Sequence, residues 1–170
     1  MERSVHDLIN AHRTSAGLPP LESEGVLGSL AREHSERMAD GERLFSHTGF
    51  DARVRAARAA LPVSAMSENV ATNNYSAAEA ADRVVSGWIG SPGHRKNLEG
   101  DFELAGVGIA RNPQGDYFVT QIYAAKSREQ RSGLLAYHPA QHAVEGAREG
   151  LLVLRAVRAG TAGLHAGSPQ

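Results

Sequence analysis

The order of its periodic segments constrains this chain more than any other feature of the sequence. Apolar residues recur at helical spacing through the first half of the chain, and two β-branched segments joined by a turn follow them. We predict helices over residues 4–16, 23–40, 51–60 and 76–90, an extended segment over 64–72, and a hairpin formed by residues 104–110 and 117–123. Because helices come first and the hairpin last, without repeated β-α-β units, the order predicts an α+β domain rather than a doubly wound parallel sheet.

Length and composition predict one folded domain with an appendage. The chain has 170 residues, of which 41% are hydrophobic and 22% charged, close to average globular usage. We therefore expect a domain over residues 1–126. Residues 127–170, rich in Ala, Gly and Arg, are predicted to form a C-terminal extension that is partly disordered.

Charge and hydropathy exclude several classes of partner. A formal net charge of −1 gives no field that would gather nucleic acid, so we expect no nucleic-acid partner. We also expect a monomer. No segment approaches the roughly 18 apolar residues needed to span a membrane. The first residues also lack the basic and apolar regions of a signal peptide.

The chain contains no cysteine. This excludes disulfide bonds, thiolate nucleophiles and every metal site with Cys ligands. Any metal has to bind to histidine and carboxylate side chains. The sequence also has no glycine fingerprint for a nucleotide cofactor, and no His-Glu-x-x-His or Gly-x-Ser-x-Gly motif of a hydrolase.

Glu68 is the first candidate functional residue. It alternates with Ser67 and Asn69 in the extended segment and shares a face with Met66 and Val70, so its carboxylate is predicted to point toward the apolar side. An unpaired charge there costs several kcal/mol, on the order of 3–5. Its partner would be a protonated histidine, a metal ion, backbone N–H groups or its own proton. A different strand register would instead leave Glu68 in water.

Three histidines accompany this carboxylate. His47 lies in a loop between apolar anchors, although a lone loop histidine is most often merely exposed. His94 lies in a turn stiffened by Pro92 and Gly93; alternatively, Ser91 and Pro92 begin a short helix with His94 in its first turn. His34 falls on the apolar face of the second predicted helix, where a hydrogen-bonded core histidine is the favoured interpretation.

Two imidazoles and one carboxylate form a ligand set that zinc accepts, with a position left open for water. We therefore predict that His47, Glu68 and His94 bind zinc or another divalent cation, and no nucleotide cofactor is expected. The same groups could perform acid–base chemistry without a metal. In an enzyme, Glu68 would be the general base.

Several linked motifs resemble the CAP superfamily of cysteine-rich secretory, antigen 5 and pathogenesis-related proteins, and especially its cysteine-free bacterial branch with SCP-like domains. The resemblance covers residues 8–123. The motifs that carry it are Leu8-Ile-Asn-Ala-His-Arg13, Leu30-Ala-Arg-Glu-His-Ser-Glu-Arg-Met-Ala39, Phe45-Ser-His47, Ser67-Glu-Asn-Val-Ala71, the segment from Trp88 to Leu98, Gly106-Val-Gly-Ile109 and Val119-Thr-Gln-Ile-Tyr123.

The resemblance implies an α-β-α sandwich with an open cleft in which histidines and acids hold a divalent ion. It also implies an extracellular or cell-envelope location and a lipid, small-molecule or cell-surface ligand. His47, Glu68 and His94 match family positions, whereas Phe118 and Ser91 stand where other members have a second histidine and a second acid. The first functional hypothesis is a non-enzymatic binding domain. The alternative is a metal-dependent hydrolase, a peptidase or esterase, that uses the same cleft.

Overall fold

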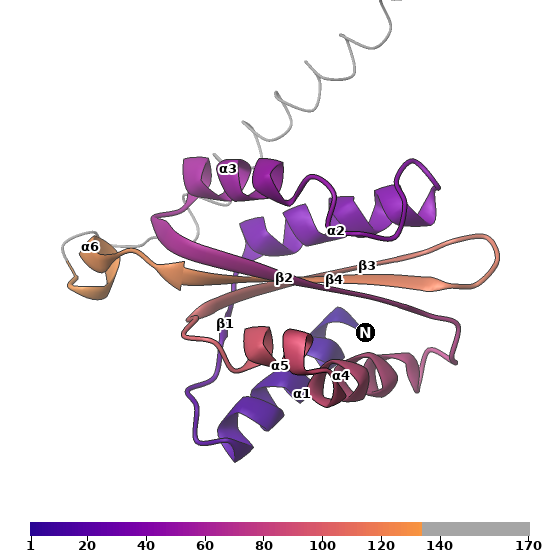
Figure 1. Ribbon diagram of the computed structural model, residues 1–170, viewed down its shortest axis with the longest axis horizontal. Helices are drawn as coiled ribbons and strands as arrows, with labels where there is room; N and C mark the ends of the chain where they lie inside the picture. Colours follow the sequence, from indigo (N-terminus) through magenta and orange to yellow (C-terminus); the bar gives the residue numbers. More distant parts are fainter. Residues whose placement is uncertain (134–170) are drawn as a thin grey trace, which may run out of the picture.

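The computed structural model describes residues 1–133 as a four-stranded sheet between two layers of helices (Figure 1). Helices α2 and α3 cover one face of the sheet, and α1, α4 and α5 cover the other. The predicted α+β class and the α-β-α sandwich are confirmed. In chain order the elements are α1 (Glu2–Ser15), β1 (Glu22–Ser23), α2 (Gly25–Ala39), α3 (Phe50–Ala60), β2 (Val63–Asn73), α4 (Ala80–Gly90), α5 (Pro92–Leu98), β3 (Leu104–Arg111), β4 (Tyr117–Lys126) and α6 (Arg128–Arg131).

The sheet has the strand order β1-β3-β4-β2. β1 pairs with β3 in parallel, whereas β3 and β2 both pair antiparallel with β4. The predicted hairpin is therefore confirmed, and its second strand also pairs with the extended segment that contains Glu68. This topology makes β2 an edge strand.

The predicted helices are present, with differences at their ends. α4 begins at Ala80 rather than near Ser76, and the Ser76 hydroxyl donates to the Glu79 carboxylate (2.6 Å) instead of capping the helix. Residues 92–98 form the short helix that was the alternative for the Ser91-Pro92 segment, with Pro92 in its first turn. The two-residue strand β1 was not predicted, since it is too short to show a period.

Each face of the sheet has its own apolar core. On the side of α1, α4 and α5, the core includes Ile9, Trp88 and Tyr123. On the side of α2 and α3 it includes Leu27 and Ile122. The two cores hold the helical layers on opposite sides of one thin sheet, so that polar residues of β2 can reach either layer.

Two glycines of β3 bring α2 unusually close to the sheet. A Cβ at Gly106 would lie 2.1 Å from the backbone nitrogen of Gly28, and one at Gly108 would lie 1.9 Å from that of Arg32. Both contacts are with helix backbone, which cannot move aside. Glycine is therefore required at both positions. This close packing fixes the position of α2 and thus the start of the loop that follows α2.

Side chains from three helices cover the edge strand β2. Its carbonyl oxygens at Ser64, Glu68 and Val70 accept hydrogen bonds from side chains rather than from another strand. The donors are Arg58 of α3 (2.8 Å), Asn97 of α5 (3.2 Å) and Trp88 of α4 (3.2 Å).

The chain continues from β4 directly into α6, where Arg131 forms an ion pair with Glu103 (Nε–Oε1 2.6 Å). The division into residues 1–126 and 127–170 stays a prediction, since most of the predicted extension, residues 134–170, lies outside the described residues. Across residues 1–133, every helix is too short or too polar to cross a membrane.

Candidate functional site

Glu68 is buried, as predicted: its side chain is 1% exposed. It lies opposite Ile122 in the β2–β4 register and points toward the layer formed by α2 and α3. The alternative register that would leave Glu68 in water is thereby excluded. A carboxylate in such a place requires partners, and the structure supplies two.

The first partner is Arg53 of α3, whose side chain is 9% exposed. Its Nε donates to Oε2 of Glu68 and its Nη2 to Oε1, both at 2.7 Å, in a two-pronged pairing of guanidinium and carboxylate. An arginine was not among the partners predicted for Glu68. The available signal was helical spacing, because Arg53 lies four residues before Ala57 and both are buried on the same side of α3.

The second partner is His47, in the loop between α2 and α3. Its Nδ1 lies 2.9 Å from Oε1 of Glu68. Since a carboxylate can only accept, Nδ1 carries the hydrogen and Nε2 is left for another ligand. The His47 side chain is 52% exposed, so the ring reaches from the buried carboxylate to solvent. We call Arg53, Glu68 and His47 the charged cluster.

A hydrogen bond from α2 holds the loop that carries His47. His34 of α2 is buried, and its Nε2 donates to the carbonyl of Ser46 at 2.9 Å. The interpretation of His34 as a hydrogen-bonded core histidine is therefore confirmed. Burial is the main cause that lowers the pKa of His34, and the nearby charge of Arg53 adds to it.

His94 lies in the first turn of α5, where its Nδ1 pairs with the Ser91 hydroxyl at 3.0 Å. Burial is the main cause that lowers the pKa of His94, and repulsion from the His47 ring in its protonated form adds to it. His47 is bonded to Glu68, and the carbonyl of His94 accepts a hydrogen bond from Asn69, the next residue of β2. Both histidines therefore lie beside this part of the strand, although His94 is not bonded to Glu68.

Asn69, the next residue of β2, fastens α5 to the strand from the opposite face. Its Nδ2 donates to the carbonyl of His94 (3.1 Å) and to the Tyr123 hydroxyl (3.4 Å). Asn97 donates to Oδ1 of Asn69 (2.8 Å) and to the carbonyl of Glu68. We call Asn69, Asn97 and Tyr123 the amide cluster. It positions the backbone of His94 relative to Glu68.

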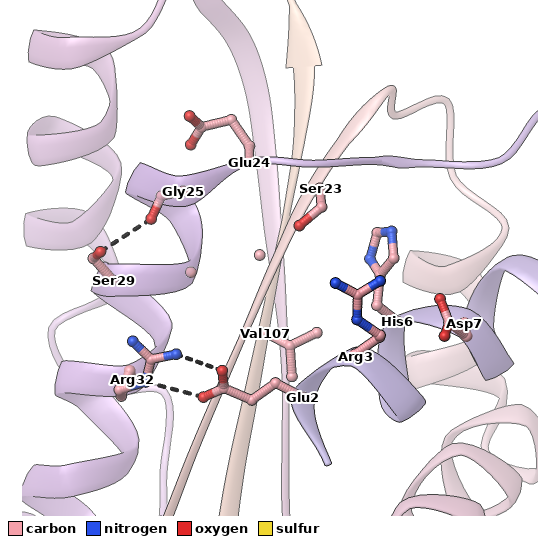
Figure 2. A pocket seen from close by; sticks show the side chains of 12 residues that line it. Glu2, Arg3, His6, Asp7, Ser23, Glu24, Gly25, Ser29, Arg32 and Val107 are labelled. Atoms are coloured by element: carbon pink, nitrogen blue, oxygen red, sulfur yellow. Dashed lines mark hydrogen bonds and ion pairs between the residues drawn. The ribbon is translucent and has the colours of Figure 1, made fainter. Parts of the chain in front are cut away.

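A cavity of about 350 Å³ lies elsewhere, between α1 and α2 beside β3 (Figure 2). Figure 2 shows Glu2 paired with Arg32 at its wall, and the same carboxylate accepts a hydrogen bond from the Ile109 N–H at 3.1 Å. None of the three predicted site residues lines it. We place the candidate site at His47 and His94 rather than at this cavity. The histidines carry groups that can bind a ligand or transfer a proton, whereas the cavity is distinguished by its volume.

The donor groups suit a metal only in part. Over residues 1–133, no three side chains of the His, Cys, Asp and Glu types are grouped so that they could hold one ion. Both oxygens of Glu68 are engaged by Arg53, which leaves the two imidazoles as the available donors. The ligand set of His47, Glu68 and His94 accordingly stays a prediction.

The sequence and the fold together define the family. The pattern of the family described as "CAP: Cysteine-rich secretory protein family" matches residues 6–123. The chain belongs to this family, and its lack of cysteine agrees with the bacterial branch.

Its relatives include bacterial proteins whose descriptions name no activity. The chain is 33% identical over 118 residues to the uncharacterized protein YkwD of Bacillus subtilis. The match covers 65% of this chain and 43% of that protein. An extracellular protein containing an SCP domain from Bacillus anthracis is 30% identical, with a TM-score of 0.60 over 74% of this chain and 40% of that one. The chain thus spans less than half of either relative.

A third similarity concerns the fold alone. An outer surface protein from Borrelia burgdorferi superposes with a TM-score of 0.61 at 18% identity, over 74% of this chain and 92% of that protein.

Proposed function

We propose that this chain is an extracellular SCP-like binding domain in which His47 and His94 hold a divalent cation through their Nε2 atoms. Glu68 would take part indirectly, as the acceptor that orients His47. The observation that carries this proposal is the use of the ring nitrogens. Nδ1 of His47 is bonded to Glu68 and Nδ1 of His94 is bonded to Ser91, whereas among residues 1–133 neither ring uses its Nε2 in a hydrogen bond.

Metal-binding histidines usually have this arrangement. One ring nitrogen donates to a carboxylate or another acceptor, which fixes the tautomer and the direction of the ring, while the other nitrogen binds the ion. The lowered pKa of His94 favours the neutral ring, the form that coordinates metals. Zinc binds imidazole nitrogens, and in open sites water completes its coordination.

The cation would supply a positive charge at the mouth of the site, able to bind an anionic group of a ligand. His47 and His94 would hold the cation. Arg53 and Glu68 would orient the His47 ring from the buried side, and Ser91 would orient the His94 ring from the start of α5. The alternative of a metal-dependent hydrolase, with Glu68 as general base, receives less support. Both carboxylate oxygens of Glu68 already accept short hydrogen bonds, so neither is free to take a proton from water.

Calorimetric titration of chelator-treated protein with Zn²⁺ tests the proposal. We expect binding at micromolar affinity or better, lost in the variant H47A/H94A. H12A is a matched control, because His12 lies on α1 and its ring pairs with Glu99 rather than with a residue of the predicted site. Absence of binding by the wild-type protein, or binding that survives the double substitution, would reject the cation site.

An extracellular location is supported by the descriptions of two structural relatives as extracellular and outer-surface proteins. Lipid, small-molecule and cell-surface ligands, and a monomeric state, stay predictions. Protease treatment of intact cells tests the location. The natural protein should be degraded or found in the medium, whereas full protection inside the cells would contradict an extracellular role.

A further inference from the structure

Arg53 contacts both the acceptor of the His47 ring and the loop backbone that carries this ring. Besides its two hydrogen bonds to Glu68, the guanidinium donates to the carbonyl of Thr48 (3.2 Å) and to that of His47 (3.5 Å). The first pair of bonds reaches the acceptor of the His47 ring. The second pair reaches the backbone from which the same ring extends.

The planar shape of the guanidinium makes these contacts restrictive. Two parallel N–H···O bonds fix both the position and the plane of the Glu68 carboxylate, which a single bond would leave free to rotate. Oε1 of Glu68 accepts from both Arg53 and His47. Once that oxygen is fixed, the direction of the His47 Nδ1–H bond is fixed with it, and Nε2 must point the opposite way.

We propose that Arg53 is the positioning residue of the histidine site, which holds His47 as the single tautomer and orientation that presents Nε2 to a ligand. The identity of that ligand rests on the function proposed above, but the orienting role of Arg53 does not. A simpler role would be to neutralise the buried charge of Glu68. The two roles differ in what they require, since neutralisation needs only a positive charge, whereas positioning needs the planar fork.

R53K separates the two roles because lysine keeps the charge and loses the fork. R55K is the matched control: Arg55 lies on the same helix and is exposed. A second variant, R53Q/E68Q, guards against misfolding of R53K. It removes both charges together, so that no buried charge is left unpaired, and keeps an amide oxygen at position 68 as an acceptor.

The first measurement is the ¹⁵N NMR spectrum of the imidazole rings in chelator-treated protein near pH 8. In the wild-type protein and R55K we expect His47 as one tautomer with the hydrogen on Nδ1. In R53K and R53Q/E68Q we expect a mixture of both tautomers. Zn²⁺ affinity should fall roughly 10–100-fold in these two variants, as for other residues that orient a metal ligand, while circular dichroism shows that each is folded.

A single Nδ1–H tautomer and wild-type affinity in folded R53K would overturn the proposal and leave Arg53 a neutralising role. If R53K does not fold, the same result in R53Q/E68Q overturns it. The tautomer measurement needs no metal. If the wild-type protein binds no Zn²⁺ but His47 loses its fixed tautomer in the variants, the cation site is wrong and the positioning role stands.

Discussion

Two adjacent residues of β2 build clusters of opposite character on the two faces of the sheet. Glu68 points toward α2 and α3 and is paired with Arg53 and His47, in the charged cluster. Asn69 points toward α5 and belongs to the amide cluster, in which each partner is neutral. Both residues are buried, and only the alternation of side chains along a strand separates them.

The clusters differ in where they end. The charged cluster runs outward to a ring that is 52% exposed, whereas Asn69 and Tyr123, in the amide cluster, are both fully buried. The first is open to a ligand, and the second is closed and fastens α5. On one face of the sheet Glu68 therefore binds His47, and on the other Asn69 holds the helix that carries His94.

Removing the carboxylate from the charged cluster should have the largest effect. E68L leaves Arg53 buried without its counterion, so we expect a loss of about 3–5 kcal/mol of unfolding free energy, measured by urea denaturation. In R53Q/E68Q, which removes both charges, most of that loss should disappear. Equal losses in the two variants would mean that the cost does not come from an unpaired charge.

The amide cluster should be less costly to break. N69A removes two donated hydrogen bonds and one accepted bond, and we expect a loss of about 1–3 kcal/mol in the same assay. The His47 tautomer should not change, because the charged cluster is left intact. N74A, at an exposed position of the loop after β2, is the control and should change stability by less than about 0.5 kcal/mol. A loss in N69A as large as in E68L would contradict the distinction between the clusters.

Acidification should lower the free energy of unfolding through a histidine beside each of the two clusters. Burial lowers the pKa of His34 beside the charged cluster and of His94 beside the amide cluster. The unfolded chain, whose histidines titrate near about 6.5, therefore takes up protons first as the pH falls. Stability should be constant well above that pH and decrease as the pH drops through it toward the lower pKa values of the folded state.

Urea midpoints of chelator-treated protein at pH 8, 6.5 and 5.5 measure this dependence. H34Q keeps a donor for the Ser46 carbonyl but does not titrate, so its midpoint should change less with pH than that of the wild-type protein. An equal or greater change in H34Q would show that His34 does not contribute.

The smallest effect is expected at the start of α5. S91A removes the partner of His94 Nδ1 at a partly buried position, and should cost less than about 1 kcal/mol. Zn²⁺ affinity should nevertheless decrease a few-fold, because the ring of His94 would be less restricted. Affinity equal to that of the wild-type protein would mean that the amide cluster alone positions His94.

Local patterns predicted most of the fold. Helical spacing located α1, α2 and α3, alternation located β2 with Glu68 facing inward, and turn residues located the hairpin. The close approach of the α2 backbone to Gly106 and Gly108 could not be predicted in this way. In the sequence the two glycines are simply part of an apolar strand, and the residues of α2 that they contact are far away along the chain.

The candidate site was predicted less completely, for the same reason. Glu68 was recognised as a buried carboxylate in need of a partner, and its alternation with Asn69 was visible. Helical spacing places Arg53 on the buried side of α3, but its pairing with Glu68 depends on how α3 folds back over β2, which no local pattern records. Pairing across the fold therefore has to be read from the structure.

The side chains that cover the outer edge of β2 have a consequence for the protein at high concentration. An edge strand with free carbonyl groups can recruit a strand from another molecule and start aggregation. Here Arg58, Asn97 and Trp88 occupy carbonyls along that edge. The strand that carries Glu68 is thus protected from intermolecular sheet formation by the helices that flank it.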